Sequence, residues 1–451
     1  MKNHSTLISK IILISLFLNL NSCKSETVIS LPNVTTASVS YITTTTAVSG
    51  GILTSDKNSE ITIKGVCWSK TSNPTINNDT TKNGSGIGNY TSYLKNLLPN
   101  TKYFLRAYAT NNAGTAYGNE VNFTTNIETT NTGFAKGADV SWLPQMEASG
   151  FKFYNASGAE KDCIEILKEN GINSIRLRTW VNPSNDKWSG HCSKDETVAM
   201  AIRAKNAGMR VMIDFHYSDS WADPSKQVKP AAWASYNFTQ LQQAVYDYTY
   251  DVMNSLKTAG VTPEWVQVGN EIPSGMIYPD GYLFKVSGKE DWTSLVALIN
   301  KGYDAIKAVS PTSKVILHVD KGNDNARFRW WFDNAKTNGA KYDVIGLSYY
   351  PYWLTGNPDY TLSINDLAAN LNDMVSRYGK EVMVVEVGGE DTKPQNTYDM
   401  LTAVIQKVKA VSNNRGLGVF YWEPQGESSW SKYALSAWMN GKPTKAMEAF
   451  K

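Results

Sequence analysis

Residues 265–271 have the sequence Trp-Val-Gln-Val-Gly-Asn-Glu, and this stretch shows most clearly how the chain is organised. Its first four residues alternate and favour β-structure, which predicts a strand. The strand ends at Gly269, and Asn270 and Glu271 follow directly. We therefore expect an amide and a carboxylic acid at a sheet edge, where both can face a ligand.

A second stretch, residues 382–388, has the sequence Val-Met-Val-Val-Glu-Val-Gly and also predicts an apolar strand. Its carboxylate is Glu386, close to the strand end. Cleavage of a glycosidic bond needs two carboxyl groups, and a separation of about 5–5.5 Å or about 6.5–9.5 Å decides between retention and inversion. The sequence leaves both outcomes open. The alternative for either glutamate is a salt bridge at the rim of the sheet.

From residue 134 to residue 451, helical stretches, a glycine and an apolar strand alternate. Glycines at the predicted helix ends are expected to adopt the left-handed conformation that terminates a helix; they are Gly171, Gly208, Gly260, Gly339 and Gly379. The strands are apolar almost throughout, which indicates a parallel sheet buried on both faces. Eight strands are expected to end near Asp139, Arg178, His216, Glu271, Asp320, Tyr350, Glu386 and Glu423.

Eight such units in about 315 residues predict an α/β fold, a (β/α)8 TIM barrel. The alternative is a doubly wound sheet, but no glycine-rich phosphate turn follows the first strand. Residues 31–125 differ from this region because Thr, Ser, Asn and Gly dominate. Their short alternating runs at 61–68, 90–94, 103–110 and 120–125 predict a small all-β immunoglobulin-like sandwich, joined to the barrel by a polar linker at 126–133.

The stretch from Leu98 to Asn111 resembles a fibronectin type III-like module. Such a module could bind sugar or act as a spacer. Its one tryptophan, Trp68, is expected in the core, so we favour the spacer.

The N-terminal residues 1–22 have the pattern of a secretory signal peptide. Lys2 and Lys10 precede or begin an apolar run that is too short to span a membrane stably. The following Leu20-Asn21-Ser22-Cys23 resembles the lipobox of bacterial lipoproteins, which implies cleavage before Cys23 and acylation of its thiol. Residues 23–30 would then be a tether. An ordinary signal peptide is the alternative; in both cases we expect an exported protein, and in the first a membrane-anchored one at the outer membrane or cell surface.

Composition excludes few classes of protein. The net charge is +3 with scattered Lys and Arg, which gives no argument for nucleic-acid binding. The 14 Trp and 24 Tyr suit stacking against ligand rings, although a large core also uses aromatic residues. The four cysteines form no Cys-x-x-Cys motif, which argues against a metal or redox motif. Whether Cys163 and Cys192 pair is not determined by the sequence.

The site of such a barrel lies at the C-terminal ends of its strands, where polar and aromatic residues gather in this chain. Asn270 can hold the 2-hydroxyl of a reacting sugar, and Arg176 can keep a nucleophilic carboxylate ionised. A tyrosine can bond that carboxylate, and Trp422 offers a flat surface for the ring.

Several longer motifs resemble those of glycoside hydrolase family 53, the endo-β-1,4-galactanases. The longest and most specific is His-Tyr-Ser-Asp-Ser-Trp-Ala-Asp-Pro at residues 216–224. The others are Gly-Ala-Asp-Val-Ser at 137–141, Arg-Leu-Arg-Thr-Trp-Val-Asn-Pro at 176–183, Val-Gly-Asn-Glu at 268–271, Gly-Leu-Ser-Tyr-Tyr-Pro at 346–351, and Val-Glu at 385–386. Together they span residues 134–425 in order.

The resemblance implies retaining endo-hydrolysis of β-1,4-galactosidic bonds in pectic galactan or arabinogalactan. Glu271 would be the acid/base and Glu386 the nucleophile. Tyr350 is preferred over Tyr349 because alternation lets one of them face inward. The residues implied in substrate binding are Asp139, Arg176, His216, Asp219, Trp221, Asn270, His318, Asp320, Tyr350, Trp353 and Trp422.

No cofactor is required by this chemistry, and no metal ligand is assigned. The resemblance allows a structural Ca²⁺ in the loops after the seventh and eighth strands, with Glu390, Asp391 and Glu427 as candidate ligands, although acidic loop residues are usually only solvated. Residues 321–325 lack an aromatic residue that the resemblance leads us to expect. Outside the motifs, His191 is expected in a loop, and Trp330 and Trp331 are expected to pack rather than bind substrate.

Two alternatives to galactan hydrolysis remain. One is the same retaining chemistry on another β-linked polysaccharide such as mannan or xylan, because the glutamate pair is common to a wider clan. The other is an inactive surface protein that binds glycans, against which both glutamates and their Asn and Arg are present. The expected partners are the polysaccharide and, through the lipid anchor, a membrane; a monomer is expected.

Overall fold

The computed structural model describes residues 28–42, 45–98, 100–125, 133–184, 191–286 and 288–451. The predicted signal peptide, Cys23, most of the tether and the linker at 126–132 lie outside the described residues. The chain divides into two compact units, Met1–Glu128 and Thr129–Lys451. Among the described residues, no helix combines the length and the apolar character needed to cross a membrane.

The first unit consists of two small antiparallel sheets. One contains β1 (Asn33–Thr36), β2 (Ala47–Ser55) and β5 (Gly88–Leu94); the other contains β3 (Ile63–Ser69), β4 (Asp79–Thr80), β6 (Lys102–Asn111), β7 (Gly114–Tyr117) and β8 (Val121–Thr124). The predicted runs correspond to β3, β5, β6 and β8. Strands β1, β2, β4 and β7 were not predicted. In β2 the Gly50-Gly51 pair interrupts the alternation, and a Cβ on Gly50 would lie 2.0 Å from the carbonyl oxygen of Tyr90 in β5. Trp68 is buried in the core of this unit.

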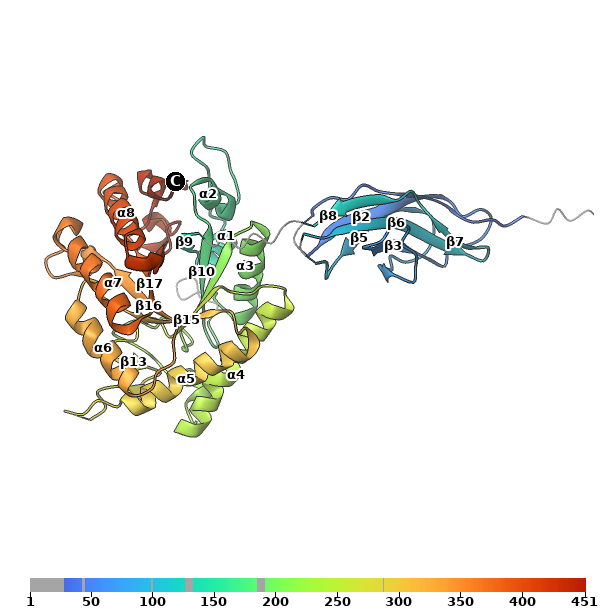
Figure 1. Ribbon diagram of the computed structural model, residues 1–451. Helices are drawn as coiled ribbons and strands as arrows, with labels where there is room; N and C mark the ends of the chain where they lie inside the picture. Colours follow the sequence, from blue (N-terminus) through green and yellow to red (C-terminus); the bar gives the residue numbers. More distant parts are fainter. Residues whose placement is uncertain (1–27, 43–44, 99, 126–132, 185–190, 287) are drawn as a thin grey trace, which may run out of the picture. The chain divides into compact units, whose positions relative to one another are not determined.

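The second unit is a closed barrel of eight parallel strands, so the predicted (β/α)8 fold is confirmed (Figure 1). Each predicted strand end lies within three residues of the observed one, and β18 pairs with β9, which excludes an open doubly wound sheet. The barrel strands are β9 (Ala135–Asp139), β10 (Ser174–Thr179), β11 (Arg210–Phe215), β12 (Trp265–Val268), β15 (Lys314–Val319), β16 (Val344–Tyr349), β17 (Glu381–Val387) and β18 (Gly416–Tyr421).

Helices lie between successive barrel strands and around the barrel (Figure 1). They are α1 (Leu143–Ala148), α2 (Cys163–Glu169), α3 (Lys194–Asn206), α4 (Phe238–Thr258), α5 (Trp292–Val309), α6 (Asn325–Thr337), α7 (Ile364–Tyr378), α8 (Pro394–Lys409) and α9 (Ser428–Ser431). Short 3-10 helices are η1 (Ala231–Trp233), η2 (Pro351–Trp353), η3 (Tyr360–Leu362), η4 (Ser412–Asn414) and η5 (Lys445–Phe450). Two hairpins lie in the loops: β13 (Gly275–Met276) pairs with β14 (Gly281–Tyr282), and β19 (Trp438–Met439) pairs with β20 (Lys442–Pro443).

The glycines predicted to terminate helices have the expected backbone. Gly171, Gly208, Gly260, Gly339 and Gly379 have φ values of 87°, 76°, 73°, 80° and 63°. A left-handed residue at this point lets the last carbonyls of a helix find partners while the chain turns toward the next strand. The predicted caps are therefore confirmed.

The barrel interior has an apolar layer below a polar one. The apolar layer is a buried cluster to which most barrel strands contribute, including Met212, Trp265, Ile316 and Phe420. Because side chains alternate along a strand, the residues two positions further on also point inward. On β11, β12 and β15 these are Asp214, Gln267 and His318, all fully buried. The polar layer forms the floor of the site described below.

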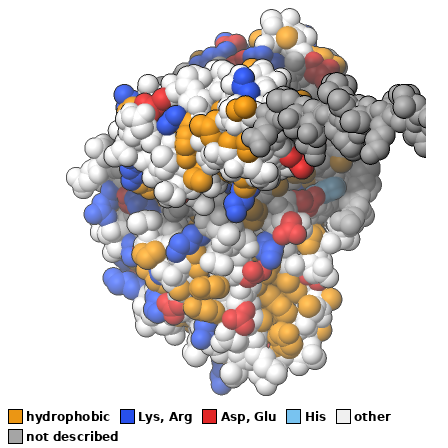
Figure 2. Space-filling model, turned by 90° about the vertical axis from the view of Figure 1, so that its right-hand side faces the viewer, with side chains coloured by type: hydrophobic (Ala, Val, Ile, Leu, Met, Phe, Trp, Pro, Cys, Tyr) orange, Lys and Arg blue, Asp and Glu red, His pale blue; other side chains and the backbone are white. Residues whose placement is uncertain are grey.

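Charged side chains of both signs are interspersed over the face drawn in Figure 2. This arrangement agrees with the nearly balanced composition, 44 basic against 41 acidic residues. A surface that attracts polyanions gathers basic side chains on one face instead.

Candidate active site

A cavity of about 840 Å³ lies at the C-terminal ends of the barrel strands. Both candidate catalytic glutamates, Glu271 and Glu386, line it. Of the predicted binding residues, it contains His216, Trp221, Asn270, Tyr350, Trp353 and Trp422, and it adds Trp142, Lys432 and Tyr433, which were not predicted. Four of these lining residues are tryptophans, so the cavity offers both a pair of carboxylates and flat apolar faces.

A smaller cavity of about 190 Å³ adjoins the first and shares Glu271, Tyr350 and Trp353 with it. It is lined further by Ser348 near the end of β16 and by loop residues that follow β15 and β16, among them Asp320 and Lys321. Glu271 therefore stands between two spaces. Trp353 borders both and is 61% exposed.

Glu386 is held at the end of β17 by Arg176 and Tyr350. Its Oε1 lies 2.8 Å from Nη2 of Arg176, and its Oε2 accepts a hydrogen bond of 3.3 Å from the Tyr350 hydroxyl. Burial raises the pKa of Glu386 to about 7, and the adjacent Arg176 opposes this increase. Tyr349, by contrast, is fully buried, and its hydroxyl bonds Ser363, so it is Tyr350 that reaches the cavity.

Arg176 is fully buried, and all three nitrogens of its guanidinium donate hydrogen bonds. Nε donates to Oε1 of Gln267 at 2.7 Å, Nη1 donates to Asp139 at 2.8 Å, and Nη2 donates to Asp214 at 2.8 Å and to Asn270 at 3.0 Å. Burial penalises its charge, but the carboxylates of Asp214, Glu386 and Asp139 raise its pKa overall. The planar fork of arginine suits this arrangement, whereas a single ammonium group does not.

Glu271 follows β12 with a positive φ of 42°, a conformation that L-residues rarely adopt. Its Oε1 accepts a hydrogen bond of 2.5 Å from the hydroxyl of Ser348 on β16. Burial raises the pKa of Glu271 well above its ordinary value, and the charges of Glu386 and Asp320 add to the effect. The two glutamates therefore differ: Glu386 has a guanidinium partner and Glu271 has only a hydroxyl, which favours the proton on Glu271.

Asn270 and His216 are oriented by partners beneath the cavity. Asn270 donates from Nδ2 to the carbonyl of Ala222 at 2.8 Å, while its Oδ1 accepts from Arg176. His216 accepts from the backbone N–H of Ala222 at Nδ1 (3.2 Å), so its Nε2–H faces Oδ2 of Asp214 at 3.0 Å. Burial raises the pKa of Asp214, but Arg176 and His216 lower it to about 2 overall. Asp214 is thus an ionised anchor for both side chains.

A second buried arginine, Arg178, supports one wall of the cavity. This tryptophan wall consists of Trp142, Trp221 and Trp422. Its guanidinium carbon lies 4.4 Å from the ring centroid of Trp221 and 5.9 Å from that of Trp422. Arg178 also bonds Glu423, which accepts the backbone N–H of Trp142 at 2.9 Å. Burial raises the pKa of Glu423 to about 8, and Arg178 opposes the increase. The predicted strand end at Glu423 is therefore a buried support for the wall rather than a lining residue.

Comparison with known proteins adds to this geometry. A sequence profile described as Glycosyl hydrolase family 53 matches residues 135–451. The chain belongs to this family.

Among the similar proteins, the arabinogalactan endo-β-1,4-galactanase of Humicola insolens is 34% identical over 310 residues, covering 64% of this chain and 89% of that protein. The endo-β-1,4-galactanase of Bacillus subtilis (strain 168) is 34% identical over 327 residues, covering 67% and 72%. Among solved structures, the family 53 catalytic domain of Ignisphaera aggregans has a TM-score of 0.63 at 30% identity, covering 71% of this chain and 96% of that one. One of two fungal β-1,4-galactanases has a TM-score of 0.62 at 31% identity, covering 70% and 98%.

Four of the predicted binding residues lie beneath or beside the cavity of this family 53 chain rather than in it. Asp139 is fully buried and pairs with Arg176. Asp219 accepts the backbone N–H groups of Asn182 and Ala231, at 3.0 and 2.8 Å, and so ties two loops together. His318 is fully buried in the polar layer. The fourth, Arg176, contacts Glu386 from beneath the cavity. These four residues therefore act through the groups that line the cavity.

Gln267 and Ser348, which bond Arg176 and Glu271, were not predicted. Sequence alternation could have shown that both point inward, since Gln267 lies two residues after Trp265 and Ser348 lies two residues before Tyr350. Their significance depends on contacts between strands that are far apart in the sequence. The same holds for Trp142 and Tyr433, whose rings meet Trp422 at centroid distances of 5.0 and 4.8 Å.

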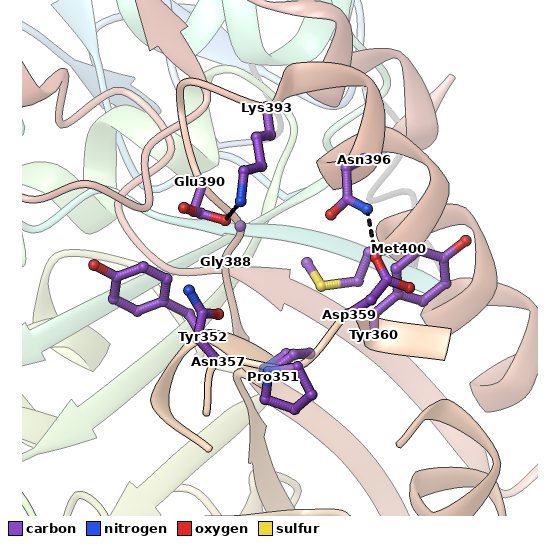
Figure 3. Close-up of a pocket in the computed structure, with 12 residues that line it drawn as sticks. Pro351, Tyr352, Asn357, Asp359, Tyr360, Gly388, Glu390, Lys393, Asn396 and Met400 are labelled. Atoms are coloured by element: carbon purple, nitrogen blue, oxygen red, sulfur yellow. Dashed lines mark hydrogen bonds and ion pairs between the residues drawn. The ribbon is translucent and has the colours of Figure 1, made fainter. Parts of the chain in front are cut away.

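The candidate calcium ligands do not form one site. Glu390 lines a separate cavity of about 180 Å³, where its carboxylate pairs with Lys393 at 2.7 Å (Figure 3). Glu427 accepts from Gly441 N–H and from the Ser429 hydroxyl, both at 2.7 Å. Among the residues that the structure describes, no group of three His, Cys, Asp or Glu side chains is placed to hold a metal ion. Calcium binding stays a prediction.

The remaining expectations concern packing. His191 contacts Glu196, and Trp331 is fully buried with its indole N–H on the carbonyl of Ile272 at 3.1 Å. Trp330 stacks on Phe284 with a centroid distance of 6.2 Å. Cys163 and Cys192 are separate, buried thiols. Burial raises the pKa of both, to about 12 for Cys192. These residues therefore support the fold.

Proposed function

We propose that this family 53 hydrolase is a retaining endo-β-1,4-galactanase of pectic galactan and arabinogalactan. The observation that carries the proposal is the different environment of two carboxylates in one cavity. Glu386 lies 2.8 Å from Arg176, whereas Glu271 bonds a hydroxyl and faces the charges of Glu386 and Asp320. Two carboxyl groups whose pKa values are separated in this way can serve as nucleophile and acid.

In the first step, the ionised Glu386 attacks the anomeric carbon of the sugar in the main cavity. The bond to the glycosidic oxygen breaks, its electron pair stays on that oxygen, and Glu271 gives the oxygen its proton. The product is a galactosyl ester of Glu386 and a free chain end. In the second step Glu271, now ionised, takes a proton from water, whose oxygen attacks the same carbon and releases Glu386.

The surrounding residues orient the sugar. One N–H of the Asn270 amide bonds Ala222, which leaves its other N–H for the 2-hydroxyl of the reacting sugar. The tryptophan wall supported by Arg178 offers the apolar faces against which pyranose rings stack. The smaller cavity beyond Glu271 receives the leaving part of the chain, because the acid must stand on that side of the broken bond. Space on both sides of the pair supports cleavage within a chain.

The substrate assignment is supported by the relatives, two of which are named as galactanases acting on arabinogalactan or galactan. We assign export and a lipid anchor at Cys23 from the N-terminal sequence, and a spacer role to the small β-rich unit, whose only tryptophan is buried. In this arrangement the hydrolase works on polysaccharide outside the membrane that holds it.

The deciding experiment measures reducing-end release from linear β-1,4-galactan, with mannan and xylan alongside. We expect short galactan oligosaccharides, early products of retained β-configuration by ¹H NMR, and a loss of activity of about 10⁴-fold or more in Glu386→Ala. Cleavage of mannan or xylan instead would contradict the substrate and keep the mechanism. Binding of galactan without any cleavage would identify a glycan-binding protein.

A further inference from the structure

A continuous chain of hydrogen bonds runs through the polar layer from Arg176 to Glu271. Arg176 Nε bonds Oε1 of Gln267 at 2.7 Å, and Gln267 Nε2 lies 3.0 Å from Nδ1 of His318. His318 Nε2 lies 2.7 Å from the hydroxyl of Ser348, which lies 2.5 Å from Oε1 of Glu271. Gln267, His318 and Ser348 are fully or almost fully buried. None of the three lines the main cavity, and Ser348 alone of the three lines the smaller one.

The direction of these hydrogen bonds follows from their first member. Arginine only donates hydrogen bonds, so the atom of Gln267 that faces Arg176 is its carbonyl oxygen. The amide nitrogen of Gln267 must then face His318 and donate to Nδ1.

A second donor confirms the role of Nδ1 as an acceptor, because the backbone N–H of Glu271 also points at it, at 3.4 Å. Oδ1 of Asn270, which also accepts from Arg176, lies 3.0 Å from the same atom and is an acceptor there. Two donors against one acceptor favour a lone pair at Nδ1. His318 then carries its proton on Nε2 and donates to Ser348.

The Ser348 oxygen accepts a hydrogen bond from His318, so the hydroxyl proton of Ser348 is donated to Oε1 of Glu271. We infer that Ser348 is a positioning residue that keeps Oε1 of Glu271 as an acceptor, so that the proton given to the leaving group is carried by Oε2. This inference rests on the proposed role of Glu271 as the acid. It deepens that role by naming the oxygen that carries the proton and the residues that select it.

The charged groups around this chain are compatible with a neutral His318. Arg176, Asp214 and His216 face the ring, and burial together with Arg176 lowers its pKa well below the ordinary value. Glu271 is faced by Glu386 on β17, by Asp320 after β15 and by Arg176 on β10. Ser348 is the uncharged contact among these groups, so its replacement changes no charge in the site.

The first test needs no enzymatic activity. Nitrogen-15 NMR of the histidine rings distinguishes the two neutral tautomers, and the chain has only four histidines. Removing His4, His191 and His216 in turn assigns the signals and leaves those of His318. We expect His318 to carry its proton on Nε2 and to stay neutral as the pH falls through the ordinary histidine pKa of about 6.5. A proton on Nδ1 would reverse the chain and overturn the inference.

The second test is the pH profile of kcat/KM on galactan in Ser348→Ala. A hydroxyl that donates to a carboxylate stabilises its charged form and lowers its pKa. Its removal therefore raises the pKa of Glu271 and moves the basic limb of the profile to higher pH. We also expect a fall in kcat of about tenfold or more, because general acid catalysis depends on orientation.

Two variants control this experiment. Ser348→Thr keeps the hydroxyl, so we expect its basic limb at the same pH as in the wild-type enzyme. Ser313→Ala removes another fully buried hydroxyl, which bonds the carbonyl of Pro263 at the opposite end of β15, and is expected to leave the limb unchanged. A basic limb that moves to lower pH, or does not move, in Ser348→Ala contradicts the inference. If no substrate is cleaved, the proposed function fails, and the histidine measurement alone decides the direction of the chain.

Discussion

Nη2 of Arg176 lies 2.8 Å from Oε1 of Glu386, although the two residues come from the non-adjacent strands β10 and β17. The same guanidinium also bonds Asp139, Asp214 and Gln267. One buried side chain thus connects the candidate nucleophile to the carboxylates of the barrel floor and, through Gln267, to the hydrogen-bond chain that ends at Glu271. Charge balance and site geometry depend on it together.

Replacement of Arg176 by lysine should therefore impair both activity and stability. An ammonium keeps the charge but cannot reach all of these partners in one plane. We expect kcat on galactan to fall by about 10²-fold or more. In Arg176→Met, which leaves buried carboxylates without a partner, the free energy of unfolding should fall by about 3–5 kcal/mol.

Chemical denaturation and steady-state kinetics measure these effects. The matched control is Arg203→Lys, because Arg203 also bonds two carboxylates, Glu147 and Asp162, but on the surface. Unchanged activity in Arg176→Lys would show that charge alone is sufficient.

The activity should have a bell-shaped pH dependence with an optimum close to neutral. Glu386 must be ionised to attack, so activity is lost as pH falls below its pKa, which burial raises to about 7. Glu271 must be protonated, so activity is lost as pH rises through its pKa, which is also raised by burial. Both limbs thus lie above the ordinary glutamate pKa of about 4.3. A profile of kcat/KM checks this, and an optimum below that value would contradict it.

Trp353 should contribute to substrate binding and not to stability. Its side chain is 61% exposed and borders both cavities, so it can stack a ring of the leaving chain. In Trp353→Ala we expect KM for galactan to rise by about tenfold, equivalent to about 1.4 kcal/mol, with the melting temperature unchanged. Trp330→Ala is the comparison, because Trp330 packs on Phe284 and Trp292 outside both cavities. Equal effects of the two variants on KM would contradict a specific role for Trp353.

Cys23 should determine where the protein is found. Acylation at this residue anchors a mature lipoprotein, so the full-length protein should be recovered with membranes and should incorporate a labelled fatty acid. In Cys23→Ser the label should be lost and the protein released, with its specific activity on galactan retained. Fractionation of cells expressing both forms measures this. A membrane-bound Cys23→Ser protein would contradict the anchor.

Local sequence was sufficient for the barrel elements. The left-handed glycines follow helices because only glycine adopts that conformation at little cost, and the apolar strands follow from burial on both faces. Asn270, Glu271 and Glu386 could be placed at one end of the barrel for the same reason: parallel strands present their C-terminal ends together. Each of these predictions depends on residues that are neighbours in the chain.

Only the tertiary structure decided which inward side chains meet. Arg176, Gln267, His318 and Ser348 lie on four strands, and their contacts depend on the stagger with which the barrel closes. The tryptophan wall around Arg178 likewise combines residues from several loops, and His318 and Asp139 proved to lie under the cavity. Alternation along a strand determines whether a side chain points inward, but its partners are set by register between strands, which no short stretch of sequence encodes.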